Sequence, residues 1–126
     1  MEKLAEKITD SELEVMRVLW EAEAPLPISD IRVALQERKG WEPTTIKTLV
    51  QRLCNKHALA QEKQNVFYYR PLISREEYQN WATNDLIRKL YRGSARNLVA
   101  ALVHSDKLSN DDLQELRDYF RMEDET

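Results

Sequence analysis

Hydrophobic residues in the first third of the chain recur at the three- and four-residue spacing of amphipathic helices. Thr9 and Glu12 have the spacing of a capping box, which predicts a helix that begins there and stops before Pro25. Its apolar positions are Leu13, Met16, Leu19 and Trp20, with Ile8 placed to pack on Leu13. The segment Pro25–Pro27 follows as a stiff linker, because proline fixes the backbone and removes a donor.

Two further helical patterns come before residue 57. The second helix is predicted to start near Ser29 and to end at Gly40, a residue type favoured just beyond a helix. It presents Ile31, Ala34 and Leu35. The third is predicted to begin at Pro43, a residue type favoured at the first helical position. Its apolar stripe is Ile46, Leu49, Val50, Leu53 and Cys54.

A change from helical to extended patterning follows the third helix. Residues 58–63 and the β-branched and aromatic run 66–70 flank Gln64 and Asn65. This arrangement predicts a two-stranded hairpin in which Asn65 adopts a positive φ and which Pro71 ends. Three helices followed by a two-stranded ribbon is the element order of a winged helix-turn-helix.

Helical patterning returns after residue 72. Ser74 and Glu77 repeat the capping box and open a helix predicted to run toward Gly93. Two more helices are expected, one with apolar residues between 98 and 103 and one that starts at Ser109. We therefore predict a mainly α protein, with a winged-helix domain at residues 1–72 and a helical domain at residues 73–126.

Composition narrows the class of protein. No run of apolar residues approaches the length of a membrane span, and residues 1–7 lack the apolar run of a secretory signal. Cys54 is the one cysteine, so no intrachain disulfide can form. We expect a cytoplasmic protein without membrane insertion.

Charge is unevenly distributed. The formal net charge is -3, but residues 44–75 contain six Lys and Arg against Glu62 alone, a local charge of +5. A basic segment of this kind favours an anionic partner, although uneven partition can also arise by chance.

The polar face of the third helix is the strongest functional signal. This face, which lies opposite the apolar stripe, contains no carboxylate, whereas an ordinary solvated helix face carries both positive and negative side chains. Thr, Gln, Lys and Arg can bind base edges and phosphates, which predicts a DNA-binding surface. That face carries Thr44, Thr45, Lys47, Thr48, Gln51, Arg52, Asn55 and Lys56, and Lys63 and Asn65 at the hairpin tip extend it.

The sequence contains no constellation that would support an enzyme. The soft metal ligands are Cys54, His57 and His104, which are too few for a structural zinc site. Cys54 lies on an apolar stripe and is read as a small core residue, and no orienting third group supports a Cys–His pair. We predict no metal, no cofactor and no catalysis, with Trp20, Trp41 and Trp81 in the core or at an interface.

The helices after residue 72 carry more apolar surface than one small winged helix needs to cover. They could pack as extra core, but exchange with a second chain buries them better. A two-fold protein also matches a two-fold DNA site. We therefore expect a homodimer.

The chain resembles the penicillinase repressors, which include the β-lactamase and methicillin-resistance repressors (BlaI/MecI). The resemblance runs through nearly the whole chain. It is carried by residues 8–16 with 18–20, by 40–49 with 52–53, by 69–78, and by 98–103 with 108–109. It implies a dimeric transcriptional repressor on a palindromic operator, with Thr44, Thr45, Lys47, Thr48 and Arg52 on the DNA and Lys63 in the wing.

Some sequence features found in members of this family are absent from this chain. Several members are cut by a membrane-embedded sensor protease between an Asn and a Phe; here that position is Ala101–Leu102, so the motif is absent. The C-terminal cysteines of copper-responsive relatives are absent from the sequence too. His57 stands where relatives often have glycine, which implies a somewhat different or less permissive backbone there. The alternative function is a winged helix that binds another protein and does not contact DNA.

Overall fold

The computed structural model describes residues 8–125; residues 1–7, which lack the apolar run of a secretory signal, and residue 126 lie outside that range. The described chain forms two compact units, one through Ala82 and one from Thr83 onward. The elements, in chain order, are α2 (Asp10–Glu21), β1 (Leu26–Pro27), α3 (Ile28–Lys39), α4 (Pro43–Asn55), β2 (Leu59–Lys63), β3 (Phe67–Pro71), α5 (Arg75–Leu90), α6 (Ala95–His104) and α7 (Asn110–Glu125). The predicted order of three helices, a hairpin and further helices is confirmed.

Local capping explains where α2 and α3 begin and end. The Glu12 amide donates to the Thr9 hydroxyl at 3.2 Å, and the Thr9 amide donates to the Glu12 carboxylate at 2.9 Å, which is the predicted capping box. At the end of α3, Gly40 adopts the left-handed φ of 66° and its amide donates to the Gln36 carbonyl. Both helix boundaries were therefore specified by residues within a few positions.

The turn after α4 differs from the expectation. His57 has a φ of 62°, so it keeps the left-handed backbone that glycine would adopt, and the prediction of a different backbone was wrong. The His57 amide donates to the Cys54 carbonyl and the Ala58 amide to the Leu53 carbonyl. These two bonds form a Schellman motif, which ends α4 and turns the chain into β2.

The sheet has three antiparallel strands in the order β1-β3-β2. The segment Pro25–Pro27, predicted to be a linker, instead supplies an edge strand in which Leu26 pairs with Tyr69 and Pro27 with Tyr68. An edge position tolerates proline because only one side of the strand is paired. Asn65 is not among the residues with positive φ, so that prediction was wrong; the hairpin closes over Gln64–Val66, where the Gln64 amide donates to the Val66 carbonyl.

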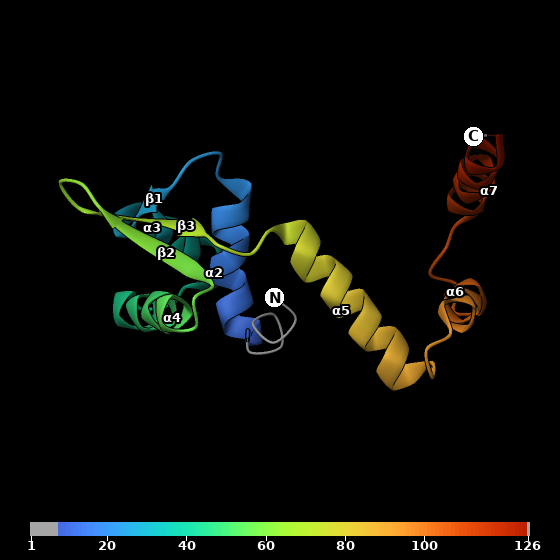
Figure 1. The fold of residues 1–126 in the computed structure, drawn as a ribbon, viewed down its shortest axis with the longest axis horizontal. Coiled ribbons are helices and arrows are strands. Elements are labelled where there is room, and N and C mark those ends of the chain that lie inside the picture. Colours follow the sequence, from blue (N-terminus) through green and yellow to red (C-terminus); the bar gives the residue numbers. More distant parts are fainter. Residues whose placement is uncertain (1–7, 126) are drawn as a thin grey trace. The chain divides into compact units, whose positions relative to one another are not determined.

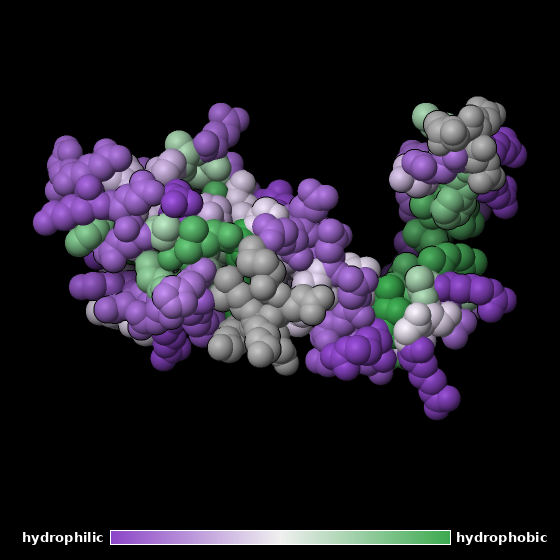
Figure 2. Space-filling view, viewed as in Figure 1, coloured by the Kyte–Doolittle hydropathy of each residue, from purple (hydrophilic) through white to green (hydrophobic). Residues whose placement is uncertain are grey.

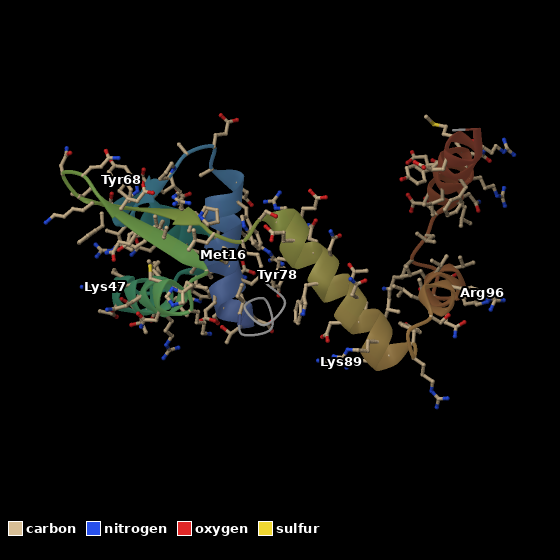
Figure 3. The ribbon with its side chains drawn as sticks, viewed as in Figure 1. Met16, Lys47, Tyr68, Tyr78, Lys89 and Arg96 are labelled. Atoms are coloured by element: carbon tan, nitrogen blue, oxygen red, sulfur yellow. The ribbon has the colours of Figure 1, made fainter. Side chains whose placement is uncertain are left out.

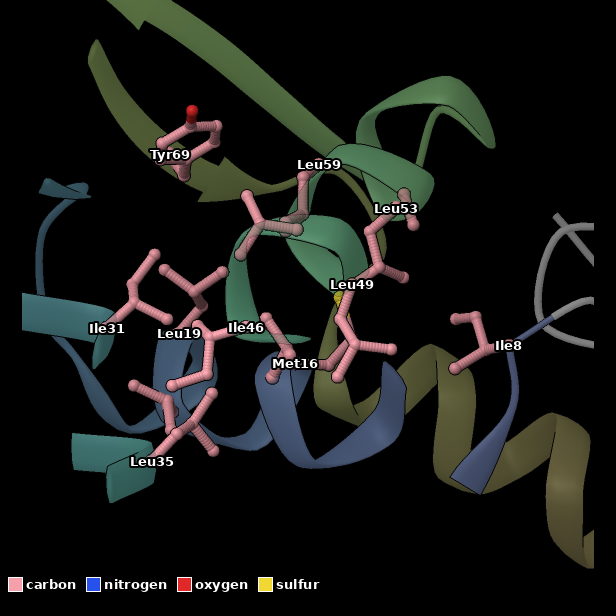
Figure 4. Packing of buried hydrophobic residues seen from close by; sticks show 14 of the residues in the cluster. Ile8, Met16, Leu19, Ile31, Leu35, Ile46, Leu49, Leu53, Leu59 and Tyr69 are labelled. Carbon is pink, nitrogen blue, oxygen red and sulfur yellow. The ribbon is translucent and has the colours of Figure 1, made fainter. Parts of the chain in front are cut away.

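The hydrophobic core lies between the three helices and the sheet. Figure 1 shows α2, α3 and α4 beside the sheet, with the loop between β2 and β3 extending away from them. The predicted stripes meet there, as Figure 4 shows, and Tyr69 closes the core from β3. The most deeply buried large side chains include Met16, Leu19, Ile31, Leu35, Ile46 and Leu53.

The beginning of α5 belongs to this same unit. The Trp20 indole donates to the Ile73 carbonyl at 2.8 Å, and the ring of Tyr78 lies 5.8 Å from that of Trp20 and 5.9 Å from that of Trp81. Trp20, Trp41 and Trp81 are all half-buried against the core, as predicted. The division of the chain after Ala82 thus falls within α5, beyond the predicted limit at residue 72.

The second unit contains the end of α5 together with α6 and α7. Ser94 caps α6, and Ser109 and Asp112 form a third reciprocal cap at the start of α7. None of the described residues of α6 is buried. Within residues 8–125, no helix combines the length and the apolar character that crossing a bilayer would require.

Candidate nucleic-acid interface

α4 is amphipathic, with its apolar and polar faces where the sequence predicted them. Ile46, Leu49, Val50 and Leu53 are buried, while Cys54 is half-buried. Of the eight positions on the predicted polar face, Lys56 is partly buried and the other seven are exposed: Thr44, Thr45, Lys47, Thr48, Gln51, Arg52 and Asn55. The core therefore holds one face of α4 and leaves the carboxylate-free face to solvent.

The exposed residues of α4 do not all lie on one side. At about 100° per residue, Thr45 and Lys47 are separated by about 200° around the helix axis. The structure accordingly places them at two different hollows. Lys47 and Gln51 line a groove of 510 Å3 beside the hairpin, and Thr44, Thr45, Thr48 and Arg52 line a smaller one of 280 Å3. A single DNA groove would contact the ridge between the two hollows and only part of each flank.

The hairpin between β2 and β3 forms the wing. Lys63 and Asn65 are both exposed there and line the same groove as Lys47. The Lys63 ammonium lies 5.7 Å from the centre of the Phe67 ring, a cation–π distance. Figure 3 shows Lys47 on α4 at the same end of this unit as the wing. The structure thus brings together Lys47, Gln51, Lys63 and Asn65.

One residue of the predicted polar face is used differently. Lys56 is only partly exposed, and its ammonium lies 2.6 Å from the buried Glu12 carboxylate. Hydrogen bonds from Lys56 and Thr9 outweigh the effect of burial, which would raise the pKa of Glu12, so this pKa is lowered. Lys56 therefore joins α4 to α2, and Lys47 and Arg52 are the cations of α4 that face outward.

The acidic residue of the wing is held by a neighbouring cation. On the wing, the Arg70 guanidinium lies 2.7 Å from the Glu62 carboxylate. Glu42 precedes α4 and makes no side-chain cap bond, in keeping with the poor capping character of glutamate. Among the described residues that line the groove beside the wing there is no carboxylate. The groove is therefore electropositive, which suits an anionic ligand.

Sequence reasoning missed three residues of this surface. Arg32 of α3 lines the groove, and its Nε atom is buried and has no hydrogen-bond partner among the described residues. Val66 and Phe67 on the wing are exposed and line it too. The exposed apolar pair beside a turn was a signal in the sequence, but the position of Arg32 depends on the packing of α3 against the sheet.

The described residues provide no group of three His, Cys, Asp or Glu side chains that could hold a metal ion. Cys54 lies half-buried in the groove wall, and burial raises the pKa of its thiol. A thiol in this state is a weak nucleophile and metal ligand, because both roles need the thiolate. The arrangement is suited to binding through charge and shape.

Comparison with known proteins gives a consistent result. A sequence model of the family described as "Penicillinase repressor" matches residues 8–122. The penicillinase repressor of Bacillus licheniformis is 32% identical over 87% of this chain and 86% of its own length. The methicillin resistance regulatory protein MecI of Staphylococcus aureus (strain N315) is 31% identical over 93% of this chain and 95% of its own.

A solved structure matches the N-terminal part of the chain. It is the solution structure of the monomeric form of Bacillus licheniformis BlaI in complex with the blaP half-operator. It shows 37% sequence identity and a TM-score of 0.51, and the match covers 57% of this chain and 88% of that one. The family model and the two sequence relatives agree, and the chain belongs to the penicillinase repressor family.

Proposed function

We propose that this protein is a transcriptional repressor that binds operator DNA as a homodimer and blocks transcription by occupying the promoter. The observation that carries the proposal is the exposed, carboxylate-free face of α4, on a fold similar to that of a repressor solved with its half-operator. In a winged helix this helix enters the major groove, and the wing lies over the neighbouring backbone.

The residues of α4 divide by chemistry into two roles. Thr44, Thr48 and Gln51 follow one another along the exposed ridge of the helix and can bond base edges or contact thymine methyl groups. The Thr48 hydroxyl donates to the Thr44 carbonyl at 2.9 Å, which leaves its lone pairs to accept from a base. Lys47 and Arg52 suit phosphate or guanine, and Thr45 completes the set at the start of the helix.

The wing extends this surface with Lys63 and Asn65. Both are exposed at the end of the hairpin, so they can reach the phosphate backbone without disturbing the core. The first turn of α4 adds the positive end of a helix dipole, and that turn itself contains no acidic residue, although the N-cap residue before it is Glu42.

Dimerisation is assigned to the helices after residue 72. α6 exposes Val99, Leu102 and Val103, and Figure 2 shows hydrophobic surface on both α6 and α7. On α7, large apolar side chains are exposed at Leu116, Tyr119, Phe120 and Met122. Helices with faces this apolar need a partner, and a second copy of the chain would supply matching faces.

The proposal is tested by footprinting the DNA upstream of the protein's own gene, with excess competitor DNA at physiological salt. We expect a protected site with two-fold symmetry. Absence of any DNA binding, even at low salt where phosphate contacts are strongest, would contradict it and favour the alternative function as a protein-binding winged helix.

A further inference from the structure

The groove between α4 and the wing has features that DNA binding does not use. Its volume of 510 Å3 lies in the range of small-molecule sites, and it is bounded by residues from α3, α4, β2 and β3. Every one of these residues belongs to the first compact unit. The groove is therefore formed within one chain.

Part of the lining of the groove is apolar, which we call its floor. Val50 and Tyr69 are buried in it and Ile28 is half-buried, while Val66 and Phe67 form an exposed apolar wall on the wing. Figure 2 shows hydrophobic atoms between the hydrophilic surfaces of the wing and α4. A phosphate needs cations and polar donors, so an apolar floor adds nothing to the binding of a DNA backbone.

The cations of the groove are spaced around this floor. Arg32 enters from α3, Lys47 from α4 and Lys63 from the wing, and no carboxylate accompanies them among the described lining residues. Of these three cations, Arg32 gives the strongest indication of a ligand, because its Nε atom is buried and has no hydrogen-bond partner among the described residues. A buried donor without a partner costs free energy, which an anionic ligand would recover once the Arg32 side chain turned its guanidinium toward the groove.

We propose that this groove binds a small organic anion, an aromatic or branched aliphatic body that carries a carboxylate. The apolar body lies on Val50, Tyr69 and Phe67, and the carboxylate accepts from Arg32. Lys47, Gln51, Lys63 and Asn65 line the same groove, so the bound anion displaces DNA from α4 and the wing. The displacement rests on the proposed function; the binding site does not.

The site is tested on the full-length protein by NMR, with 1-naphthoate as the probe. We expect saturable shifts of the Arg32 Nε–Hε resonance and of the Val50 and Phe67 amides. Arg32→Gln should weaken the binding of naphthoate about tenfold or more, since a hydrogen bond to a charged group is lost. The matched control is Arg38→Gln, a cation on the same helix that pairs with Glu21 outside the groove and should leave affinity unchanged.

Two further probes define the ligand class. Neutral 1-naphthalenemethanol and inorganic phosphate should each bind far more weakly than naphthoate. Equal affinity for the alcohol, equal affinity for phosphate, or shifts confined to α6 and α7 would each overturn the proposal. If Arg32→Gln does not fold, Lys63→Gln replaces it, with an expected loss of about threefold because this cation is exposed.

Displacement is measured separately, by the anisotropy of a labelled duplex that carries the footprinted site. Naphthoate should release the duplex from the wild type, and Arg32→Gln should need about tenfold more naphthoate for the same release. A protein that binds naphthoate but no duplex would contradict the proposed repressor function and leave the anion site standing. A protein that binds both together would overturn the displacement.

Discussion

The Lys56 ammonium lies 2.6 Å from the Glu12 carboxylate and joins the C-terminal end of α4 to the first turn of α2. Glu12 is 1% exposed, and it also accepts the Thr9 amide within the capping box. One carboxylate therefore fixes both the start of a scaffold helix and the end of the helix proposed to enter DNA.

Removing the cation of this pair should be costly. Lys56→Met leaves Glu12 buried without its partner, and we expect a loss of about 3 kcal/mol in the free energy of unfolding by urea. The matched control is Arg38→Met, whose pair with Glu21 is exposed and should cost less than about 1 kcal/mol. In a Glu12→Gln background, Lys56→Met should become nearly neutral; an unchanged cost there would show that the pair is not the cause.

The same pair should make stability depend on pH. The pKa of Glu12 is lowered from its usual 4.5, so the folded state binds fewer protons than the unfolded state near that pH. The stabilisation is present above pH 4.5 and is lost as pH falls through the lower folded value. Urea unfolding at pH 6, 4 and 3 should show the difference between wild type and Glu12→Gln shrinking with acidity. A difference that stays constant over this range would refute the assignment.

The outward-facing cations of α4 give a prediction for DNA. Lys47→Ala and Arg52→Ala should each lower operator affinity about tenfold or more and reduce the salt slope by about one, with an unchanged far-UV spectrum. Arg38→Ala, on the exposed end of α3, serves as the control and should bind as wild type. Wild-type affinity in both α4 variants would argue against α4 as the recognition helix.

The exposed apolar face of α6 gives a prediction for assembly. Leu102→Asp should convert the protein in sedimentation experiments from about twice its chain mass to the 14.9 kDa monomer, because a charge cannot be buried unpaired at an interface. Asn97→Glu places a charge on the polar side of the same helix and should leave the dimer intact. A Leu102→Asp protein that remained dimeric would move the interface elsewhere.

The left-handed residue after α4 should limit stability. His57 has a φ of 62°, a conformation that costs a residue with a Cβ about 1 kcal/mol, so His57→Gly should stabilise the fold by about that amount. Gly40→Ala provides the converse test, since its φ is +66° and nothing lies within 4 Å of an added Cβ. Its cost of about 1 kcal/mol would then come from the backbone alone. Urea midpoints that move the other way would contradict this.

The features that could be predicted from the sequence are those that depend on residues close together in the chain. Examples are the capping boxes that begin at Thr9 and Ser74 and the apolar stripe of α4. Each depends on residues three or four positions apart, and each is present in the structure. The sequence could not predict contacts between residues far apart in the chain, such as the pairing of Leu26 with Tyr69 or of Lys56 with Glu12. Of the predicted binding surface, every residue except Lys56 is exposed as expected, but the separation into two hollows required the position of the wing.

Within residues 8–125, three helices begin with the same reciprocal bonds, at Thr9 with Glu12, Ser74 with Glu77, and Ser109 with Asp112. Each pair closes within three residues, so it needs nothing from the rest of the chain. As the protein leaves the ribosome, α2, α5 and α7 can each start at the correct residue before later segments have been synthesised. On α7, the apolar face proposed for dimerisation would then be set by a signal within its own first turn.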